Sequence, residues 1–290
     1  MDKPKRIVLI SDISGESGSI IPWGLNLGKH TGSEVDILHI IDPRDNQGVE
    51  SPVSDSQSIT PGDKLSREEI LKREKGKAEQ GLDKLLSKEA SRLNYPLKIN
   101  TIIETKYLEE GLKSVFSERH GSLMITSSEH DNTSFTDLDE LLAISRGLAA
   151  PVFIIPPGTG FQKPGKAFML ADYSDSPSQD MNNMFDWLTP FNPMVNAGMV
   201  IQEMKDYIKL ELAAKRWKKV IENIIDSGIT LRTTQLKGES FTKTVANYVD
   251  RNKFDWVIIP KSKKESSKKI FSVDISKKLL KSIKKPVLLY

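Results

Sequence analysis

Residues 151–155 (Pro-Val-Phe-Ile-Ile) and residues 286–290 (Pro-Val-Leu-Leu-Tyr) are two copies of one short apolar segment, 135 positions apart in a chain of 290 residues. The segment before each copy is repeated as well, because residues 120–128 match residues 254–262 at an offset of 134. Two neighbouring strand patterns that recur in the same order indicate an internal repeat.

Both halves of the chain alternate short apolar runs with amphipathic stretches. The runs expected to form strands are residues 6–12, 35–41, 97–103, 122–126 and 151–155, and then 167–172, 196–201, 230–236, 254–260 and 286–290. Strands that alternate with helices are typical of parallel sheets. We therefore predict an α/β, Rossmann-like fold with two tandem open parallel five-stranded sheets and helices on both faces. The domains are residues 1–160 and 161–290.

The composition excludes several classes of protein. Hydrophobic residues make up 38% and charged residues 28%, which is typical of a globular chain, and no apolar run is long enough to span a membrane. The N-terminal residues lead directly into a strand pattern and not into a signal peptide. The absence of cysteine excludes disulfides, thiol nucleophiles and cysteine-bound metals, and a cytoplasmic location is expected.

The positive charge is concentrated at the C-terminal end. The formal net charge is +3, but residues 261–290 carry +8, so residues 1–260 carry −5. Within this end, an apolar stripe is formed by Ile275, Leu279, Leu280 and Ile283, and packing of that stripe explains the helix with its lysines in water. The loop lysines between residues 261 and 269 are the better candidates for binding an anion. Docking on nucleic acid or an anionic surface is an alternative function, although nucleic acid is the less favoured partner.

Three landmarks together resemble the universal stress protein family in its tandem, two-domain form. They are the strand that ends at Asp12, the strand end Leu38-His-Ile-Ile41, and the closing Pro-Val strands at Pro151 and Pro286. The resemblance implies a stress-response protein that acts by binding a ligand or a partner. It also implies self-association through the final strands, either within this chain or in a homodimer.

Family members that bind ATP carry Gly-x-x-Gly and then Gly-Ser or Gly-Thr after the fourth strand, where backbone N–H groups approach the phosphates. Residues 127–137 and 261–274, which occupy this place in the two halves, contain no glycine. The nucleotide-binding loops are therefore degenerate, and no cofactor is expected. Binding of ATP or another phosphate-bearing ligand at an unorthodox site is the alternative.

Polar residues follow the strands at the edge where parallel sheets bind ligands. Asp12 and Asp172 each follow the first strand of a half, and they either contact a ligand or metal or accept N–H bonds from the next turn. The candidate ligand-binding residues are Asp12, Ile41, Ser127, Ser134, Asp172, Lys261 and Ser272.

Catalytic and metal-binding patterns are missing from the sequence. The four histidines show no metal spacing, and His39 is expected to be a hydrogen-bonded residue inside a strand. No nucleophile elbow or Walker sequence is present. We therefore expect neither a bound metal nor enzymatic activity.

Overall fold

A computed structural model gives the fold of the chain. It describes residues 6–11, 13, 17–43, 67–90, 92, 94–117, 122–128, 138–148, 150–173, 179–201, 207–223, 228–261 and 273–290.

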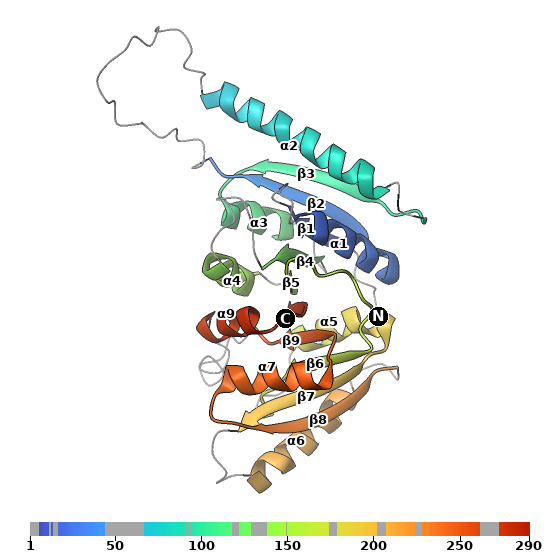
Figure 1. Cartoon of the computed structure of the whole chain (residues 1–290), viewed down its shortest axis with the longest axis vertical. Coiled ribbons are helices and arrows are strands. Elements are labelled where there is room, and N and C mark those ends of the chain that lie inside the picture. The colour runs from blue at the N-terminus through green and yellow to red at the C-terminus, as the bar shows by residue number, and fades with distance from the viewer. Residues whose placement is uncertain are drawn as a thin grey trace, which may run out of the picture.

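The described elements alternate along the chain as predicted (Figure 1). The first half contains β1 (Arg6–Ile10), α1 (Ser17–Thr31), β2 (Glu34–Ile41), α2 (Arg67–Ala90), β3 (Ile99–Thr105), α3 (Leu108–Ser117), β4 (Ser122–Ser127), α4 (Leu138–Gly147) and β5 (Val152–Ile155). The second half contains β6 (Lys166–Leu170), α5 (Gln179–Leu188), the 3-10 helix η2 (Thr189–Phe191), β7 (Met194–Ile201), α6 (Tyr207–Glu222), β8 (Thr230–Lys237), α7 (Phe241–Asn252), β9 (Trp256–Ile259), α9 (Val273–Ser282) and β10 (Val287–Leu289).

The strands form one ten-stranded sheet in the order β3-β2-β1-β4-β5-β10-β9-β6-β7-β8. Neighbouring strands are parallel within each half. The two sets of five strands join where β5 pairs with β10 in antiparallel register, with Phe153 opposite Leu288. The pairing of final strands that the family resemblance implies is thus formed within the chain.

Helices cover both faces of the sheet. Buried side chains from α1, α2, α5 and α6 pack on one face, and those from α3, α4, α7 and α9 pack on the other. Each core runs through both halves because the sheet is continuous.

Aromatic side chains fill the junction between the halves. The ring centroid of Phe153 on β5 lies 4.9 Å from that of Trp256 on β9 and 5.0 Å from that of Trp23 on α1. All three are fully buried. Aromatic pairs at these distances add to the free energy gained from burial, so this cluster holds the halves together.

The register corrects one detail of the predicted repeat. The backbone N–H of Met124 donates to Pro151 O, and that of Val257 donates to Pro286 O, each at 3.0 Å. Met124 therefore corresponds to Val257, an offset of 133 and not 134. An error of one residue matters because it moves every side chain to the opposite face of the sheet.

The helix α6 buries only part of its apolar surface. Trp217 and Ile221 are buried, whereas Ile208, Leu212 and Val220 are 74%, 50% and 45% exposed.

The apolar stripe predicted at the C-terminal end is confirmed by α9, where Leu279 is fully buried.

Candidate functional site

The strand order defines two places where a ligand of a doubly wound sheet would lie. The order reverses between β1 and β4 in the first half and between β6 and β9 in the second. Ligands of such sheets bind outside the carboxyl ends of the strands at these points. Because β5 and β10 are antiparallel, the two carboxyl edges face opposite directions.

The structure describes four of the predicted site residues. Ile41 is the last residue of β2 and Ser127 is the last residue of β4, and both are buried. The strand β1 lies between β2 and β4, so it separates these two residues. Asp172 lies two residues after the end of β6, and Lys261 lies two residues after the end of β9. These two strands are neighbours in the sheet. The other three predicted residues, Asp12, Ser134 and Ser272, lie outside the described residues.

The edge of the first half is organised by Ser11, which sequence reasoning did not single out. The Ser11 hydroxyl accepts a hydrogen bond from the backbone N–H of Ile13 at 3.2 Å. Its carbonyl oxygen lies 2.8 Å from Nδ1 of His39, which is 8% exposed. His39 is therefore a hydrogen-bonded residue within a strand, as predicted.

In the second half a buried tyrosine takes the place that Ile13 has in the first. The Tyr173 hydroxyl lies 2.7 Å from Ala197 O and 3.0 Å from Thr234 O, and it accepts a hydrogen bond from the N–H of Thr234. Burial raises the pKa of Tyr173 above its usual range, so the phenol is neutral. Its hydroxyl thus lies against the middle of β7 and β8, and its ring packs on Trp217.

Lys261 reaches across the junction into the first half. Its ammonium group donates to the carbonyl oxygens of Ala150 and Leu148, the latter at 3.4 Å. These carbonyls follow the end of α4, where a helix carries partial negative charge. Lys261, which was predicted from the sequence to bind a ligand, thus links the two halves through its side chain.

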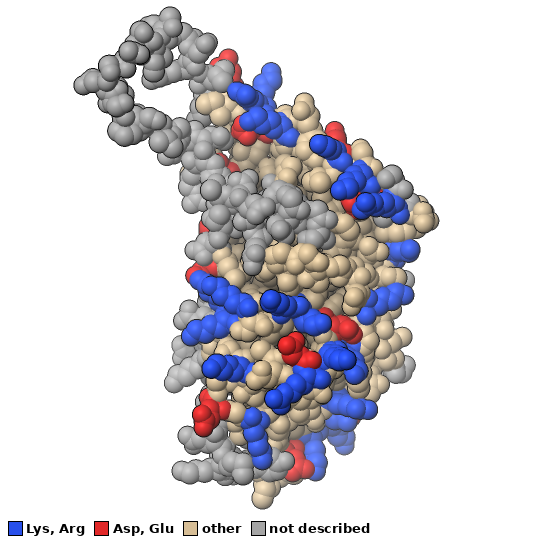
Figure 2. All heavy atoms as spheres, viewed as in Figure 1, with Lys and Arg blue, Asp and Glu red and all other residues tan. Residues whose placement is uncertain are grey.

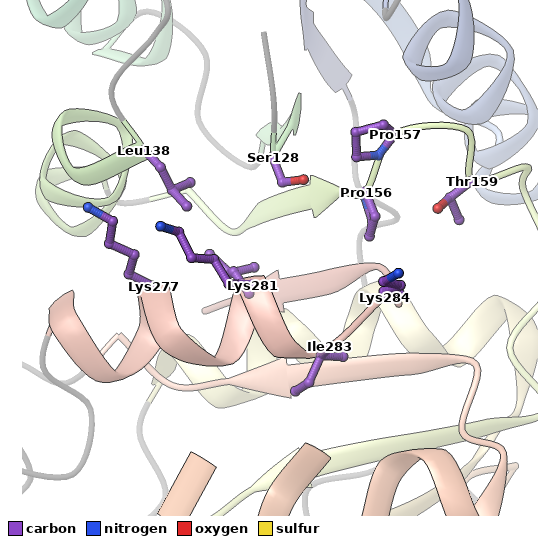
Figure 3. A pocket seen from close by; sticks show the side chains of 10 residues that line it. Ser128, Leu138, Pro156, Pro157, Thr159, Lys277, Lys281, Ile283 and Lys284 are labelled. Carbon is purple, nitrogen blue, oxygen red and sulfur yellow. The ribbon is translucent and has the colours of Figure 1, made fainter. Parts of the chain in front are cut away.

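A cavity of about 690 Å³ lies at the junction beside the carboxyl edge of the first half (Figure 3). It is lined by residues that follow β4 and β5, by the start of α4, by α9 and by the two residues after it: Ser128, Leu138, Pro156, Pro157, Thr159, Lys277, Leu280, Lys281, Ile283 and Lys284. Sequence reasoning missed this cavity because its walls come from segments far apart in the chain. The one available signal was the spacing of Lys277 and Lys281, which places two cations on one side of α9.

The lining combines positive charge with apolar walls. Lys277 forms an ion pair with Asp139 of α4. Lys281 and Lys284 form no ion pair with an acidic residue in the part of the chain that the structure describes. Lysine and arginine side chains also gather on the surface where Figure 1 places α9 and α7 (Figure 2). Among the described residues, the lining thus has two lysines without an acidic partner, beside the apolar side chains of Leu280 and Ile283.

Neither a metal-binding cluster nor a membrane-spanning helix is found among the described residues. Among them, no group of three or more histidine or acidic side chains is placed to hold a metal ion. No described helix is both long enough and apolar enough to cross a membrane.

Comparison with known proteins shows similarity of structure alone. No family model matches the sequence, and no curated protein matches it. Among solved structures, a universal stress protein from Archaeoglobus fulgidus DSM 4304 is similar over 99% of this chain and 96% of its own, with a TM-score of 0.64 and 14% identity.

Two other solved structures are similar over 99% of this chain. One is a functionally unknown protein from Pseudomonas aeruginosa PAO1, with 92% of its chain covered, a TM-score of 0.52 and 12% identity. The other is the cytoplasmic domain of a prokaryotic cation chloride cotransporter, with 95% covered, a TM-score of 0.51 and 9% identity. The predicted universal stress protein-like, Rossmann-like fold is thus confirmed, and the function must be argued from the chain's own residues.

Proposed function

We propose that this chain is a universal stress protein-like binding protein that acts in a stress response and takes a small ligand in the cavity at the junction of its halves. The observation that carries the proposal is the cavity itself, about 690 Å³ in volume and lined by both halves. Ligand sites in proteins usually have a volume of roughly 300–1,000 Å³, and this cavity lies within that range.

The proposed role is binding without chemical conversion. The described lining residues offer lysine, serine and threonine as polar groups, and neither histidine nor a carboxylate is among them. General acid–base catalysis relies mostly on histidine and carboxylate side chains. The lining therefore favours a receptor over an enzyme.

The adenine-nucleotide alternative relies on the predicted edge residues, such as Asp12 and Asp172. The loops after β4 and β9 lack glycine, so they offer a phosphate no close backbone approach of the kind that glycine permits. In the second half, the buried Tyr173 side chain lies beyond β6, against β7 and β8, and its hydroxyl is bonded to their backbone. We therefore favour the junction cavity over the two strand edges.

Methyl-labelled NMR tests this proposal and separates the two locations. Leu280 and Ile283 report on the cavity, and Ile41 reports on the carboxyl edge of the first half. A panel of small metabolites that includes ATP is titrated into the whole chain. We expect at least one compound to shift the Leu280 and Ile283 signals and to leave Ile41 unchanged. A panel whose active members all shift Ile41 alone would contradict the proposed location.

A further inference from the structure

A second cavity, of about 270 Å³, lies between α1 and the residues that connect α2 to β3. One wall is a stripe of α1 that includes Asn26 and Lys29, and the other wall includes Glu89, Arg92 and Tyr95. The helix α1 leads into the first residue of β2, and the second wall leads into the first residue of β3. This amino-edge cavity therefore lies toward the amino ends of the strands, opposite to the edge where doubly wound sheets bind ligands.

Tyr95 joins the two walls of the amino-edge cavity. Its hydroxyl donates to Leu25 O at 2.9 Å, and Nζ of Lys29 lies 4.5 Å from the centroid of its ring. Burial raises the pKa of Tyr95, so the phenol keeps its proton at neutral pH and stays a donor. Walls that are joined in this way are in place before a ligand arrives, which lowers the ordering cost of binding.

The cavity presents one acidic and one basic group that lack part of their hydrogen bonding. Glu89 is buried, and its carboxylate accepts one hydrogen bond from the described residues, at 3.1 Å from the exposed Arg92. The Lys29 ammonium group has no acidic or carbonyl partner in the same part of the chain. A carboxylate has lone pairs for several donors, and its burial is costly without them. Glu89 can therefore accept from a further donor, and Lys29 can donate to an acceptor.

We propose that the amino-edge cavity binds a small amino acid as a zwitterion, with its ammonium group on Glu89 and its carboxylate on Lys29. The side-chain N–H of Asn26 donates to Pro22 O at 2.8 Å, which leaves the amide oxygen of Asn26 as a second acceptor for the ammonium group. A simple carboxylic acid would meet Lys29 alone, whereas a zwitterion supplies both missing partners.

The size of the cavity agrees with this class of ligand. Its volume of about 270 Å³ is just below the roughly 300–1,000 Å³ of sites for drug-sized molecules, so it suits a ligand of few heavy atoms. It shares no lining residue with the junction cavity. The proposal therefore goes beyond the proposed function and does not depend on it.

Three amino acids test the class of ligand, because one, two and three carbon atoms separate their charged groups: glycine, β-alanine and γ-aminobutyrate. Each is titrated into the whole chain, and NMR follows the side-chain amide of Asn26 in the cavity and that of Asn196, which bonds to Tyr248 in the second half. We expect at least one of the three to shift the Asn26 signal saturably and to leave the Asn196 signal unchanged. If none shifts the Asn26 signal, the proposal fails.

Analogues that lack one charged group test the zwitterion. For glycine these are acetate and methylamine, for β-alanine propionate and ethylamine, and for γ-aminobutyrate butyrate and propylamine. Each analogue of the best ligand should bind about ten-fold more weakly, because one charged hydrogen bond is lost. An analogue that binds as tightly as its amino acid would overturn the zwitterion assignment.

Glu89→Gln and Lys29→Met separate the two contacts. Both variants should bind the amino acid about ten-fold more weakly than the parent does. Glu89→Gln should bind the carboxylate analogue no more weakly than the parent, and Lys29→Met should bind the amine analogue no more weakly than the parent. These differences identify which protein group meets which end of the ligand, and a loss of structure alone would weaken all compounds together.

The matched controls are Glu79→Gln and Lys84→Met, which change exposed residues of α2 that do not line the cavity and should bind as the parent does. Circular dichroism and the thermal midpoint report whether each variant is folded. Because Glu89 is buried and Lys29 is exposed, Lys29→Met decides the result if Glu89→Gln does not fold. Affinity for the amino acid equal to that of the parent in Lys29→Met, or in a folded Glu89→Gln, would contradict the proposal.

Discussion

Removing the ammonium group of Lys261 tests whether one side chain holds the two halves together. Lys261→Met keeps the unbranched stem and deletes the donor that reaches Ala150 O and Leu148 O. A hydrogen bond from a charged group contributes roughly 1.5–3 kcal/mol to the free energy of unfolding. Lys261 is half-buried and water can partly replace it, so we expect a loss of about 2 kcal/mol, near the lower end of that range.

Urea denaturation measures this loss. The four buried tryptophans report through fluorescence, and circular dichroism reports on the helices. With an m-value of about 3 kcal/mol per molar, a loss of about 2 kcal/mol lowers the midpoint by roughly 0.7 M urea. The matched control is Lys243→Met, an exposed lysine on α7, which should stay within about 0.5 kcal/mol of the parent.

The comparison of the two variants decides the result. If Lys261→Met and Lys243→Met have the same midpoint as the parent, the ammonium group does not stabilise the junction. If the unfolding free energy depended less steeply on urea concentration while the midpoint stayed the same, the cooperativity between the halves would be altered.

Four further predictions concern the core, the junction, nucleotide binding and pH. Leu279→Ala should cost about 2–5 kcal/mol in urea denaturation because Leu279 is fully buried, and a loss under 1 kcal/mol would contradict its burial. Trp256→Ala should cost about 3–5 kcal/mol by the same measurement, since its ring packs on aromatic rings of both halves, and an unchanged midpoint would refute that packing. ATP should bind with a dissociation constant above about 100 μM in calorimetry because the loops after β4 and β9 lack glycine, and micromolar binding would refute the degenerate-loop interpretation. Burial and the charges of Lys163 and Lys29 lower the pKa of His30, so on acidification the unfolded chain binds this proton at a higher pH than the folded chain does. Acidification from about pH 7.5 to 5.5 should therefore lower the thermal midpoint of the parent more than that of His30→Gln, and equal slopes would show that His30 is not responsible.

The order of elements could be predicted because buried parallel strands have continuous apolar sequences that differ from those of helices. The weakest strand pattern in the sequence, Asn196–Ile201, belongs to β7. Its polar and small residues meet side chains of other strands and of a helix. Asn196 bonds to Thr234 and Tyr248. A Cβ on Gly198 would come within 2.4 Å of the Phe168 ring, so this position needs glycine. Such contacts between strands cannot be read from one strand alone.

The candidate site was much less predictable than the fold. The sequence indicated that the lysines of the last helix flank an apolar stripe with their charges in water. The structure instead brings Lys277 to Asp139 and places Lys281 and Lys284 at the wall of a cavity. This arrangement depends on α9 of the second half lying beside α4 of the first, which follows from the pairing of β5 with β10. No spacing within either segment carries that information.

The alignment error of one residue hides which residue of the first half corresponds to Lys261 at the junction. At an offset of 134, Lys261 would correspond to Ser127, which ends β4 and is buried. At the offset of 133 set by the backbone hydrogen bonds, it corresponds to Ser128, which lines the cavity. Side chains alternate along a strand, so only the second alignment puts both residues on the same face of the sheet. The two halves of one repeat therefore differ at this position, because Lys261 bonds across the junction and Ser128 lines the cavity.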